Sequence, residues 1–366
     1  MRVALTVEQS WHVVPGGIAT TSVELMRALQ QRGDVALVGV AAHHRFPPPR
    51  DLTPPIPVRR FPLPRRALYG AWQWLRAPKV ERATGDVDVV HDLGYVVPPS
   101  NAPLVATVHD LLFLTYPAHY TRPSRLVLRR GLELAGRHAR LVVCPSATTM
   151  RACEDLGFES ARLRVVPWGV RTPDIDPVSS STVLRRYGLD RPFVLFCGTL
   201  EPRKNLGRTL EAFRRVNPSA TQLVLAGPRG WKQELDGQLG HLGAKARWLG
   251  HVPRHDLDAL YAEAVMLVYP SLAEGFGLPV LEAMALGTPV VTSAGTAMEE
   301  VAGDTALLVD PLDVDSIAAG IERLLDDHDL AVRLGDAGRS RAAGFTWERT
   351  AAMMRVIYAE VSGSAS

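Results

Sequence analysis

Short, wholly apolar runs alternate along this chain with segments of helical periodicity, and the alternation takes place twice. In the first half we expect six strands, at Arg2–Val7, Val35–Val40, Val87–His91, Leu104–Val108, Leu141–Val143 and Leu163–Val166. Strands that are apolar throughout and separated by helices indicate a parallel sheet that is covered on both faces. Eight prolines lie between Phe46 and Pro64, and they predict an extended surface loop there instead of regular structure.

The alternation is interrupted once, by the segment TPDIDPVSSS at residues 172–181. It then restarts, and six more strands are expected at Phe193–Phe196, Gln222–Leu225, Arg247–Leu249, Met266–Tyr269, Val290–Thr292 and Leu307–Val309. A length of 366 residues exceeds what one hydrophobic core usually supports. The predicted fold class is therefore α/β, with two doubly wound parallel-sheet domains, 1–170 and 171–345, that face a cleft. The last helix, within 346–366, is expected to pack back on the N-terminal domain.

Composition narrows the class of protein. Hydrophobic residues make up 46% of the chain and charged residues 22%, which is ordinary for a soluble globular enzyme. No stretch approaches the roughly 20 apolar residues of a membrane span. Three cysteines without metal-ligand spacing indicate free thiols, so we expect a cytoplasmic protein.

The two halves of the chain differ in charge. Residues 1–170 carry 21 Lys+Arg and 13 Asp+Glu, a net charge of +8, whereas residues 171–366 carry 20 and 25, a net charge of −5. This difference suggests a different ligand for each half, although chance variation between solvated surfaces explains it as well. The arginines are scattered and no nucleic-acid-binding motif accompanies them, so nucleic acid is not an expected partner.

The segment SLAEGFGLPVLEAMALGTPVV, residues 271–291, carries the strongest chemical pattern. Glu274 follows an apolar strand that ends near Tyr269, and Glu282 is expected in the first turn of the next helix. The glycines between them let a ligand approach the backbone, and free amides at a helix start bind anions. A glutamate that only complements the helix dipole would explain Glu282, but not the Glu-Gly-Phe-Gly loop.

A second segment, FCGTLEPRKNLGRTLEAF at residues 196–213, repeats this order of strand, polar loop and helix. Arg203 and Lys204 lie at the exit of the strand, where two cations can clamp a diphosphate, and Asn205 is placed to cap the helix. Adjacent basic residues in a loop are more often simply solvated. Their expected place on the same sheet edge as Glu274 favours a binding role.

These two segments, with a Gly-Gly pair at the start of the first helix, resemble the large retaining family of family-four glycosyltransferases. The resemblance implies the GT-B fold, in which two Rossmann-like domains hold a nucleotide sugar mainly through the C-terminal one. It implies that Arg203 and Lys204 hold the donor diphosphate, whereas Glu274 binds hydroxyls of the transferred sugar and Glu282 binds the ribose. The residues whose loop amides would face phosphate and sugar are Phe276, Gly277 and Leu278.

The chain departs from the family at one position of the second segment. Many members carry a basic residue soon after the glycine that ends the strand, whereas this chain has Thr199 after Gly198. Arg203 is the residue expected to supply the missing charge, which leaves its role less firmly implied than that of Lys204.

In the N-terminal half, the resemblance points to residues at the ends of strands. Gly16 and Gly17, after Pro15, would belong to a loop that closes over the donor phosphates and borders the acceptor. His109 would lie beside the reacting sugar. Ser146 is equally well explained as a donor contact and as a helix cap. The residues His91 and Asp92 also end a strand, and they are weaker candidates.

No metal and no other cofactor is expected. Metal-dependent glycosyltransferases hold a divalent cation with an Asp-x-Asp pair, and five such pairs occur here, at 86/88, 174/176, 256/258, 313/315 and 327/329. All five are expected at the starts of strands or helices, in the linker or between helices, where acidic residues are ordinary. None is expected at the carboxyl end of a strand.

The sequence therefore predicts a retaining, metal-independent glycosyltransferase. It would move a hexose, first of all mannose from GDP-mannose, to a glycan, lipid-linked or small-molecule acceptor. One alternative is a sugar-nucleotide epimerase of the same fold, which would turn over donor without acceptor. Another is a non-catalytic sugar-nucleotide-binding protein, which would not need Lys204, Glu274 and Glu282 together.

A basic, aromatic segment at residues 59–82 suggests one further partner. It combines seven basic residues with four aromatic ones, Phe61, Tyr69, Trp72 and Trp74. Basic residues beside aromatics suit the surface of an anionic membrane. We therefore hypothesise peripheral contact with the inner face of the cell membrane; the alternative is that the aromatics pack into the core.

Overall fold

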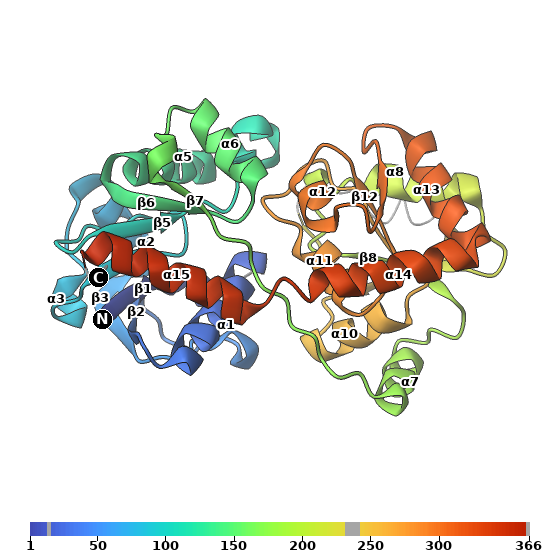
Figure 1. The fold of residues 1–366 in the computed structure, drawn as a ribbon, viewed down its shortest axis with the longest axis horizontal. Helices are drawn as coiled ribbons and strands as arrows, with labels where there is room; N and C mark the ends of the chain where they lie inside the picture. Colours follow the sequence, from blue (N-terminus) through green and yellow to red (C-terminus); the bar gives the residue numbers. More distant parts are fainter. Residues whose placement is uncertain (13–15, 231–241, 364–366) are drawn as a thin grey trace. The chain divides into compact units, whose positions relative to one another are not determined.

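The computed structural model describes residues 1–12, 16–230 and 242–363, which form two compact units (Figure 1). Unit 1 comprises Met1–Gly169 with Thr346–Ser366, and unit 2 comprises Val170–Phe345. Each unit is built on one parallel sheet with helices on its faces. The α/β class predicted from the alternation of apolar runs is confirmed.

The sheet of unit 1 has seven strands in the order β3-β2-β1-β4-β5-β6-β7. Their bounds are β1 Arg2–Thr6, β2 Ala36–His43, β3 Val58–Pro64, β4 Val89–Asp92, β5 Leu104–Thr107, β6 Ala139–Cys144 and β7 Leu163–Val165. Strands β4 and β5 are buried at every residue. This burial explains why these strands read as unbroken apolar runs in the sequence.

The prediction of a structureless loop at 46–64 was partly wrong. Strand β3 forms at the end of this segment and pairs in parallel with β2, with Arg59 beside Val40. It lies at the edge of the sheet, where a proline that lacks an N–H is tolerated. The dense prolines therefore hid an edge strand from the sequence pattern.

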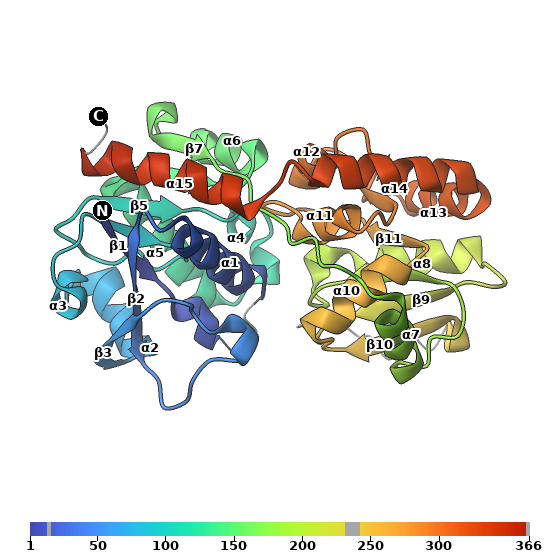
Figure 2. The ribbon, with the colours of Figure 1, turned by 60° about the horizontal axis from the view of Figure 1, so that its bottom comes forward.

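The last helix of the chain belongs to unit 1, where it lies beside the first helix (Figure 1 and Figure 2). Helix α15 buries Met354 and Tyr358, and the Thr350 hydroxyl donates a hydrogen bond to the Pro167 carbonyl at 2.7 Å. The helices of this unit are α1 Gly16–Arg32, α2 Arg65–Gly70, α3 Glu81–Thr84, α4 Leu112–Thr115, α5 Arg122–His138, α6 Ala147–Asp155 and α15 Trp347–Ser362.

The sheet of unit 2 has six strands in the order β10-β9-β8-β11-β12-β13, all parallel. They are β8 Phe193–Cys197, β9 Gln222–Ala226, β10 Ala246–Gly250, β11 Met266–Tyr269, β12 Val290–Ser293 and β13 Leu307–Val309. The described helices are α7 Pro177–Arg186, α8 Leu206–Val216, α10 Arg254–Glu263, α11 Leu278–Ala285, α12 Ala297–Ala302, α13 Val314–Asp326 and α14 His328–Ala342. All six strands predicted for this half are present.

Both sheets share a topological feature that positions ligands. The strand order reverses direction between β1 and β4 in unit 1, and between β8 and β11 in unit 2. In open parallel sheets, ligands bind outside the carboxyl ends of the strands at such a switch point. We therefore expect the ligand-binding residues in the loops that follow these four strands.

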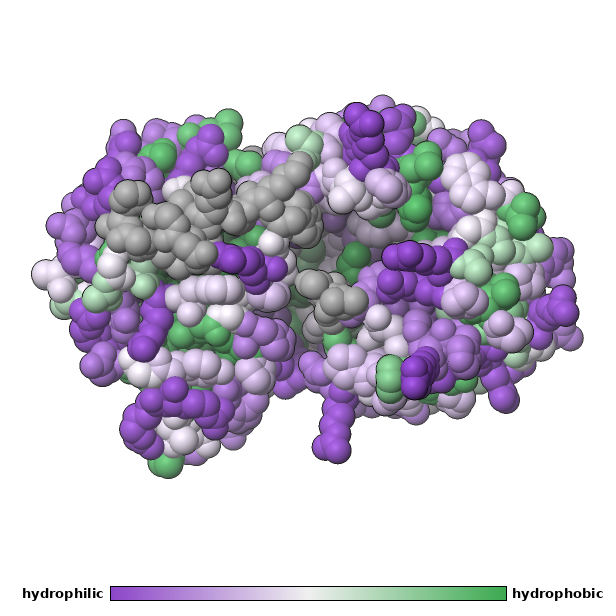
Figure 3. Space-filling model, turned by 180° about the vertical axis from the view of Figure 1, so that it is seen from behind, coloured by the Kyte–Doolittle hydropathy of each residue, from purple (hydrophilic) through white to green (hydrophobic). Residues whose placement is uncertain are grey.

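The helices of the described residues are each too short or too polar to span a bilayer. The face of the molecule in Figure 3 is mainly hydrophilic, with hydrophobic residues in small, separate patches. Patches of this size are normal for a protein surface in water.

Candidate active site

Two side chains meet across the switch point of unit 2. Lys204 ends the short turn Pro202–Lys204 after β8, and Glu274 lies in the loop after β11. The Lys204 ammonium donates to Glu274 Oε1 at 2.5 Å and also to the hydroxyl of Tyr269, the last residue of β11. Two segments that are 70 residues apart in sequence are thus joined because their strands are neighbours in the sheet.

Arg203 completes this group. One of its guanidinium nitrogens lies 2.6 Å from Glu274 Oε2, and the other lies 2.5 Å from Glu201 Oε1. The Ser271 hydroxyl donates to Glu274 Oε1 at 3.0 Å. Both oxygens of the Glu274 carboxylate are therefore held in place, and the two cations are paired with two carboxylates inside the unit.

Burial and pairing set the charge states in this group. Burial disfavours the charged form of Glu274, but the positive charges of Arg203 and Lys204 outweigh burial and lower its pKa to about 2. Burial and the neighbouring Arg203 lower the pKa of Lys204, whereas Glu274 acts in the opposite direction. Glu274 is thus a fixed anion at neutral pH, and Lys204 is a cation with little access to water.

Two glycines give this site its shape. Gly198, directly after β8, has φ +114°, and a Cβ at this position would lie 3.7 Å from Lys204 Cε. Gly277 has φ +104°, and a Cβ there would stand 2.7 Å from Met298 Cγ. Gly277 caps α11 and brings the amides of its first turn to the end of β11. The positive φ favours glycine at both positions, and at Gly277 the contact with Met298 also leaves no space for a side chain.

The side chain of Phe276 fixes the loop between Glu274 and α11. Phe276 is buried, and its ring packs edge-on against Phe345 at 6.2 Å between centroids. Leu278 is the first residue of α11, and Pro279 occupies the first turn. The Phe276 side chain thus anchors the loop, so any ligand contact there would involve the backbone.

Asn205 does not cap α8 with its side chain, contrary to expectation. Its backbone has φ +63°, and its amide donates to the carbonyls of Pro270 at 2.9 Å and Pro311 at 2.6 Å. Asn205 instead ties the loop after β8 to the loop after β11. This contact fixes the position of the neighbouring Lys204.

The prediction that Glu282 lies in the first turn of its helix was wrong by one turn. Helix α11 begins at Leu278, so Glu282 falls in its second turn, where it accepts a hydrogen bond from the Tyr261 hydroxyl at 3.0 Å. Its other oxygen contacts Arg254, whose Nε lies 2.8 Å from Asp258 Oδ1. Sequence reasoning missed Arg254 and Tyr261, which come from α10.

In unit 1, His109 lies in the loop after β5. Its Nε2 donates to the Leu93 carbonyl at 2.8 Å, so the neutral ring presents Nδ1 as a hydrogen-bond acceptor. Burial lowers the pKa of His109 and keeps it neutral at pH 7. The ring lies 5.8 Å from the rings of both Tyr95 and Trp168.

Among the other predicted residues of unit 1, Ser146 and His91 form hydrogen bonds within the unit. Ser146 is fully buried and caps α6, where its hydroxyl accepts from the Thr149 amide at 3.0 Å. His91 lies 2.8 Å from both the Thr107 and the Tyr358 hydroxyls and links β4, β5 and α15. Gly16 and Gly17 open α1 and are exposed, whereas Pro15 lies outside the described residues.

Four aspartates of the Asp-x-Asp pairs accept hydrogen bonds from backbone amides. Asp176, Asp313 and Asp327 accept hydrogen bonds from amides at helix starts, and Asp88 accepts one from the Arg2 amide. Within the described part of the chain, no three His, Cys, Asp or Glu side chains form a group that could hold a metal ion.

Comparison with known proteins places this geometry in a family. Residues 15–173 match the family model described as Glycosyltransferase Family 4, and residues 185–341 match that of Glycosyl transferases group 1. The O-antigen chain mannosyltransferase B of Escherichia coli is 34% identical over 304 residues, which cover 80% of this chain and 78% of that protein. This chain belongs to the family-four glycosyltransferases.

A second relative and a solved structure are also similar to this chain. The MMP alpha-(1->4)-mannosyltransferase of Mycolicibacterium hassiacum is 35% identical over 310 residues, covering 78% of this glycosyltransferase and 73% of that protein. The structure of HepE from Anabaena in complex with UDP and glucose matches with a TM-score of 0.79 at 20% identity, over 98% of this chain and 100% of that chain. The protein is therefore a glycosyltransferase enzyme of the GT-B fold with mannosyltransferase relatives.

Proposed function

We propose that this glycosyltransferase transfers mannose from GDP-mannose, with retention of anomeric configuration and without a metal, to a glycan, lipid-linked or small-molecule hydroxyl. The observation that supports the proposal is the ion-paired group of the buried Lys204 with the partly buried Arg203 and Glu274 at the switch point of unit 2. Two relatives whose printed names are mannosyltransferases favour mannose as the sugar.

The charged group suits the chemistry of a nucleotide-diphosphate leaving group. When the bond from the sugar to the diphosphate breaks, negative charge develops on the phosphate oxygens, and preorganised cations stabilise it. Arg203 and Lys204 would supply those charges together with the amides at the start of α11. The acceptor oxygen would attack the anomeric carbon from the side that the diphosphate leaves, and the departing phosphate would take the proton of the acceptor.

Glu274 and Glu282 would have separate tasks. Glu274 is held as an anion by donors on both oxygens, three of them on Oε1, so Oε2 would accept a hydrogen bond from a sugar hydroxyl. Glu282 is held by Arg254 and Tyr261 one helical turn further from the loop, which suits contact with the ribose. For His109 of unit 1 the family resemblance implies a contact with the reacting sugar, in which Nδ1 would accept a hydrogen bond from a hydroxyl.

A nucleotide panel tests the donor. Thermal unfolding would be followed with GDP, GDP-mannose, UDP, UDP-glucose and dTDP at equal concentration. A ligand at a hundred times its Kd stabilises the folded state by about 2.7 kcal/mol, which raises Tm by several degrees. We expect GDP and GDP-mannose to give the largest shift. A larger shift with the uridine or thymidine ligands would refute GDP-mannose as the donor.

The structure divides the aromatic residues of the segment 59–82 into buried residues and residues that could touch a membrane. Phe61 and Trp72 are buried and pack edge to face at 5.8 Å between ring centroids, so the alternative of core packing is correct for these two. Trp74 is 55% exposed and Leu75 is 76% exposed, at the end of the π-helical segment Ala71–Leu75 that follows α2. Arg130 of α5 lies over the Trp74 ring at 5.3 Å, and Leu126 of the same helix is 57% exposed.

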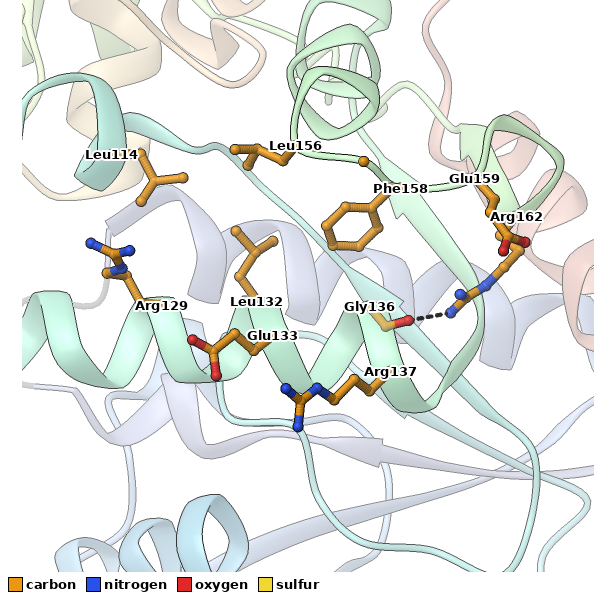
Figure 4. Close-up of a pocket in the computed structure, with 11 residues that line it drawn as sticks. Leu114, Arg129, Leu132, Glu133, Gly136, Arg137, Leu156, Phe158, Glu159 and Arg162 are labelled. Carbon is orange, nitrogen blue, oxygen red and sulfur yellow. Dashed lines mark hydrogen bonds between the residues drawn. The ribbon is translucent and has the colours of Figure 1, made fainter.

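Helix α5 also borders a cavity. Leu132, Leu156 and Phe158 point into a cavity of about 380 Å³ between α5 and the loop after α6, with Arg129 and Arg137 at its edge (Figure 4). The charged residues of its lining have both signs, Arg129, Arg137 and Arg162 with Glu133 and Glu159. The exposed Trp74, Leu75 and Leu126 beside Arg130 suit the interface of an anionic bilayer. We extend the proposal to a peripheral membrane contact through Trp74, Leu75 and Leu126.

Vesicle sedimentation tests this contact. We expect the protein to sediment with vesicles that contain anionic phosphatidylglycerol at low salt and to detach at high salt. Leu75→Glu should reduce the bound fraction, whereas Val356→Glu, at a position on α15 that is 66% exposed, should not. Protein that stays in the supernatant at low salt would favour a soluble acceptor.

A further inference from the structure

One arginine of unit 2 lies between two carboxylates, one of which belongs to Glu282. Arg254 is the first residue of α10, which packs against α11 (Figure 1). Its Nη1 contacts Glu282 Oε1 on α11, and its Nε lies 2.8 Å from Asp258 Oδ1, one turn further along α10. Arg254 therefore joins two helices through two different nitrogens, which a lysine with its single charged nitrogen would not reproduce.

The position of Arg254 in its helix is unfavourable for a cation. The first turn of a helix carries the positive end of the helix dipole, which stabilises acidic side chains there instead of basic ones. Burial also disfavours the charged form of Arg254, but the carboxylates of Glu282 and Asp258 outweigh burial and raise its pKa. The side chain of Asp258 is only 4% exposed and that of Glu282 is 12% exposed. The two carboxylates are thus what stabilises the guanidinium at this place.

A hydroxyl group binds the second oxygen of Glu282. The Tyr261 hydroxyl donates to Oε2 at 3.0 Å, and Cys197 Sγ lies 2.8 Å from the same hydroxyl oxygen. Because a carboxylate only accepts hydrogen bonds, Tyr261 must donate to Glu282, and the Cys197 thiol then donates to Tyr261. Burial raises the pKa of Cys197 to about 12, so this thiol keeps its proton. Helix α10 therefore orients both oxygens of Glu282, and the last residue of β8 supports one of these contacts.

These contacts prepare Glu282 for a ligand. A glutamate side chain has several rotatable bonds, and fixing it during binding costs conformational entropy. Anchors on both oxygens meet this cost when the protein folds, before a ligand arrives. Each oxygen of Glu282 has one such anchor, so each keeps a lone pair that can accept a hydrogen bond from a ligand hydroxyl.

We propose that Arg254 is a positioning residue that holds Glu282 in the orientation in which it binds the ribose hydroxyls of the nucleotide. This inference rests on the proposed function, because it needs Glu282 to bind the ribose. Arg254 then sets the preference of the enzyme for a ribonucleotide over a nucleotide that lacks the 2′ and 3′ hydroxyls. It acts through Glu282 and takes no part in bond breaking.

Two nucleotides test this role. GDP and 2′,3′-dideoxy-GDP differ only in the ribose hydroxyls, and calorimetric titration would give their Kd for wild type and variants. UDP and its dideoxy counterpart would replace them if the nucleotide panel favours uridine. We expect Arg254→Gln to weaken the binding of GDP by about tenfold and to leave the binding of dideoxy-GDP nearly unchanged. A residue with only a structural role would weaken the binding of both nucleotides equally.

Combined variants show whether Arg254 acts through Glu282. Glu282→Ala should abolish the preference for ribose, and Arg254→Gln combined with Glu282→Ala should bind GDP as Glu282→Ala alone does. Loss of Arg254 deprives the buried Asp258 of the nearer of its two cations, so Arg254→Gln is also combined with Asp258→Asn in case the single variant does not fold. Tyr261→Phe, which removes only the hydroxyl at Oε2, should act in the same direction as Arg254→Gln.

Arg186→Gln is the matched control. Arg186 lies 2.8 Å from Asp256 of the same helix α10, so the variant removes an ion pair of this helix without touching Glu282, and it should bind both nucleotides as wild type does. Equal GDP affinity of wild type and the folded Arg254 variants, or an equal loss for both nucleotides, would overturn the inference alone. A ribose preference that survives in Glu282→Ala would refute the proposed role of Glu282, and the inference with it.

Discussion

Replacement of Lys204 by alanine should lower kcat strongly and the free energy of unfolding only slightly. Lowering the pKa of Glu274 from its ordinary 4.5 to about 2 corresponds to about 3 kcal/mol in favour of the carboxylate. Arg203 also contributes to this lowering of the pKa and stays in place in the variant. Removal of Lys204 also removes the cost of burying an ammonium, which is 8% exposed. We therefore expect a loss of about 1 kcal/mol, or about 2–4 °C in Tm.

The effect on turnover should be larger than the effect on folding. Loss of one preorganised group that stabilises transition-state charge lowers kcat by about a hundredfold or more, equivalent to about 2.7 kcal/mol. Release of GDP from GDP-mannose in the presence of acceptor would measure this. Lys245→Ala is the matched control, because Lys245 lies on the surface of the same unit and contacts Asn217. A folded Lys204→Ala enzyme with near-normal kcat would refute the reasoning.

Three further predictions concern the same site. Glu274→Gln should impair transfer while nucleotide affinity survives, and Glu282→Ala should weaken nucleotide binding more; titrations that reverse this order would show that the two roles are exchanged. Because the folded pKa of Glu274 is about 2 and lies below its unfolded value, its contribution to stability is present above pH 4.5 and is lost as the pH falls toward 2. Acid unfolding curves should therefore show a weaker dependence between pH 4.5 and 2 in Glu274→Gln than in wild type. Activity should be unchanged in EDTA, and a loss that Mg²⁺ or Mn²⁺ restores would contradict metal independence.

The sequence was most informative where local pattern determines structure. Four of the six strands predicted for unit 2, β8, β9, β11 and β12, are buried at every residue, and buried parallel strands read as apolar runs. Strands β10 and β13 are only partly buried and were predicted from their place in the alternation with helices. Edge strand β3 was missed because Pro62 and Pro64 are unfavourable for a strand in general and are tolerated at an edge. Recognising this strand requires knowledge of the strand order, which the local pattern does not contain.

The site was only partly predictable for a related reason. Lys204 and Glu274 could be assigned to one sheet edge because each follows a strand. The partners of Glu282, Arg254 and Tyr261, come from another helix, and no spacing in the sequence signals that they meet. The sequence pattern also does not show which single atoms are buried without a hydrogen-bond partner among the described residues, as Asp92 Oδ2 is.

The stereochemistry of the product tests the central proposal most directly. GDP-mannose carries its sugar in the α configuration, and transfer with retention would leave an α-linked mannose on the acceptor. The anomeric signal of the first product, followed by NMR during turnover, distinguishes the two configurations before any later rearrangement. We predict an α-linked mannoside that forms only when the acceptor is present. A β-linked product, or donor consumption without transfer, would contradict the proposed reaction.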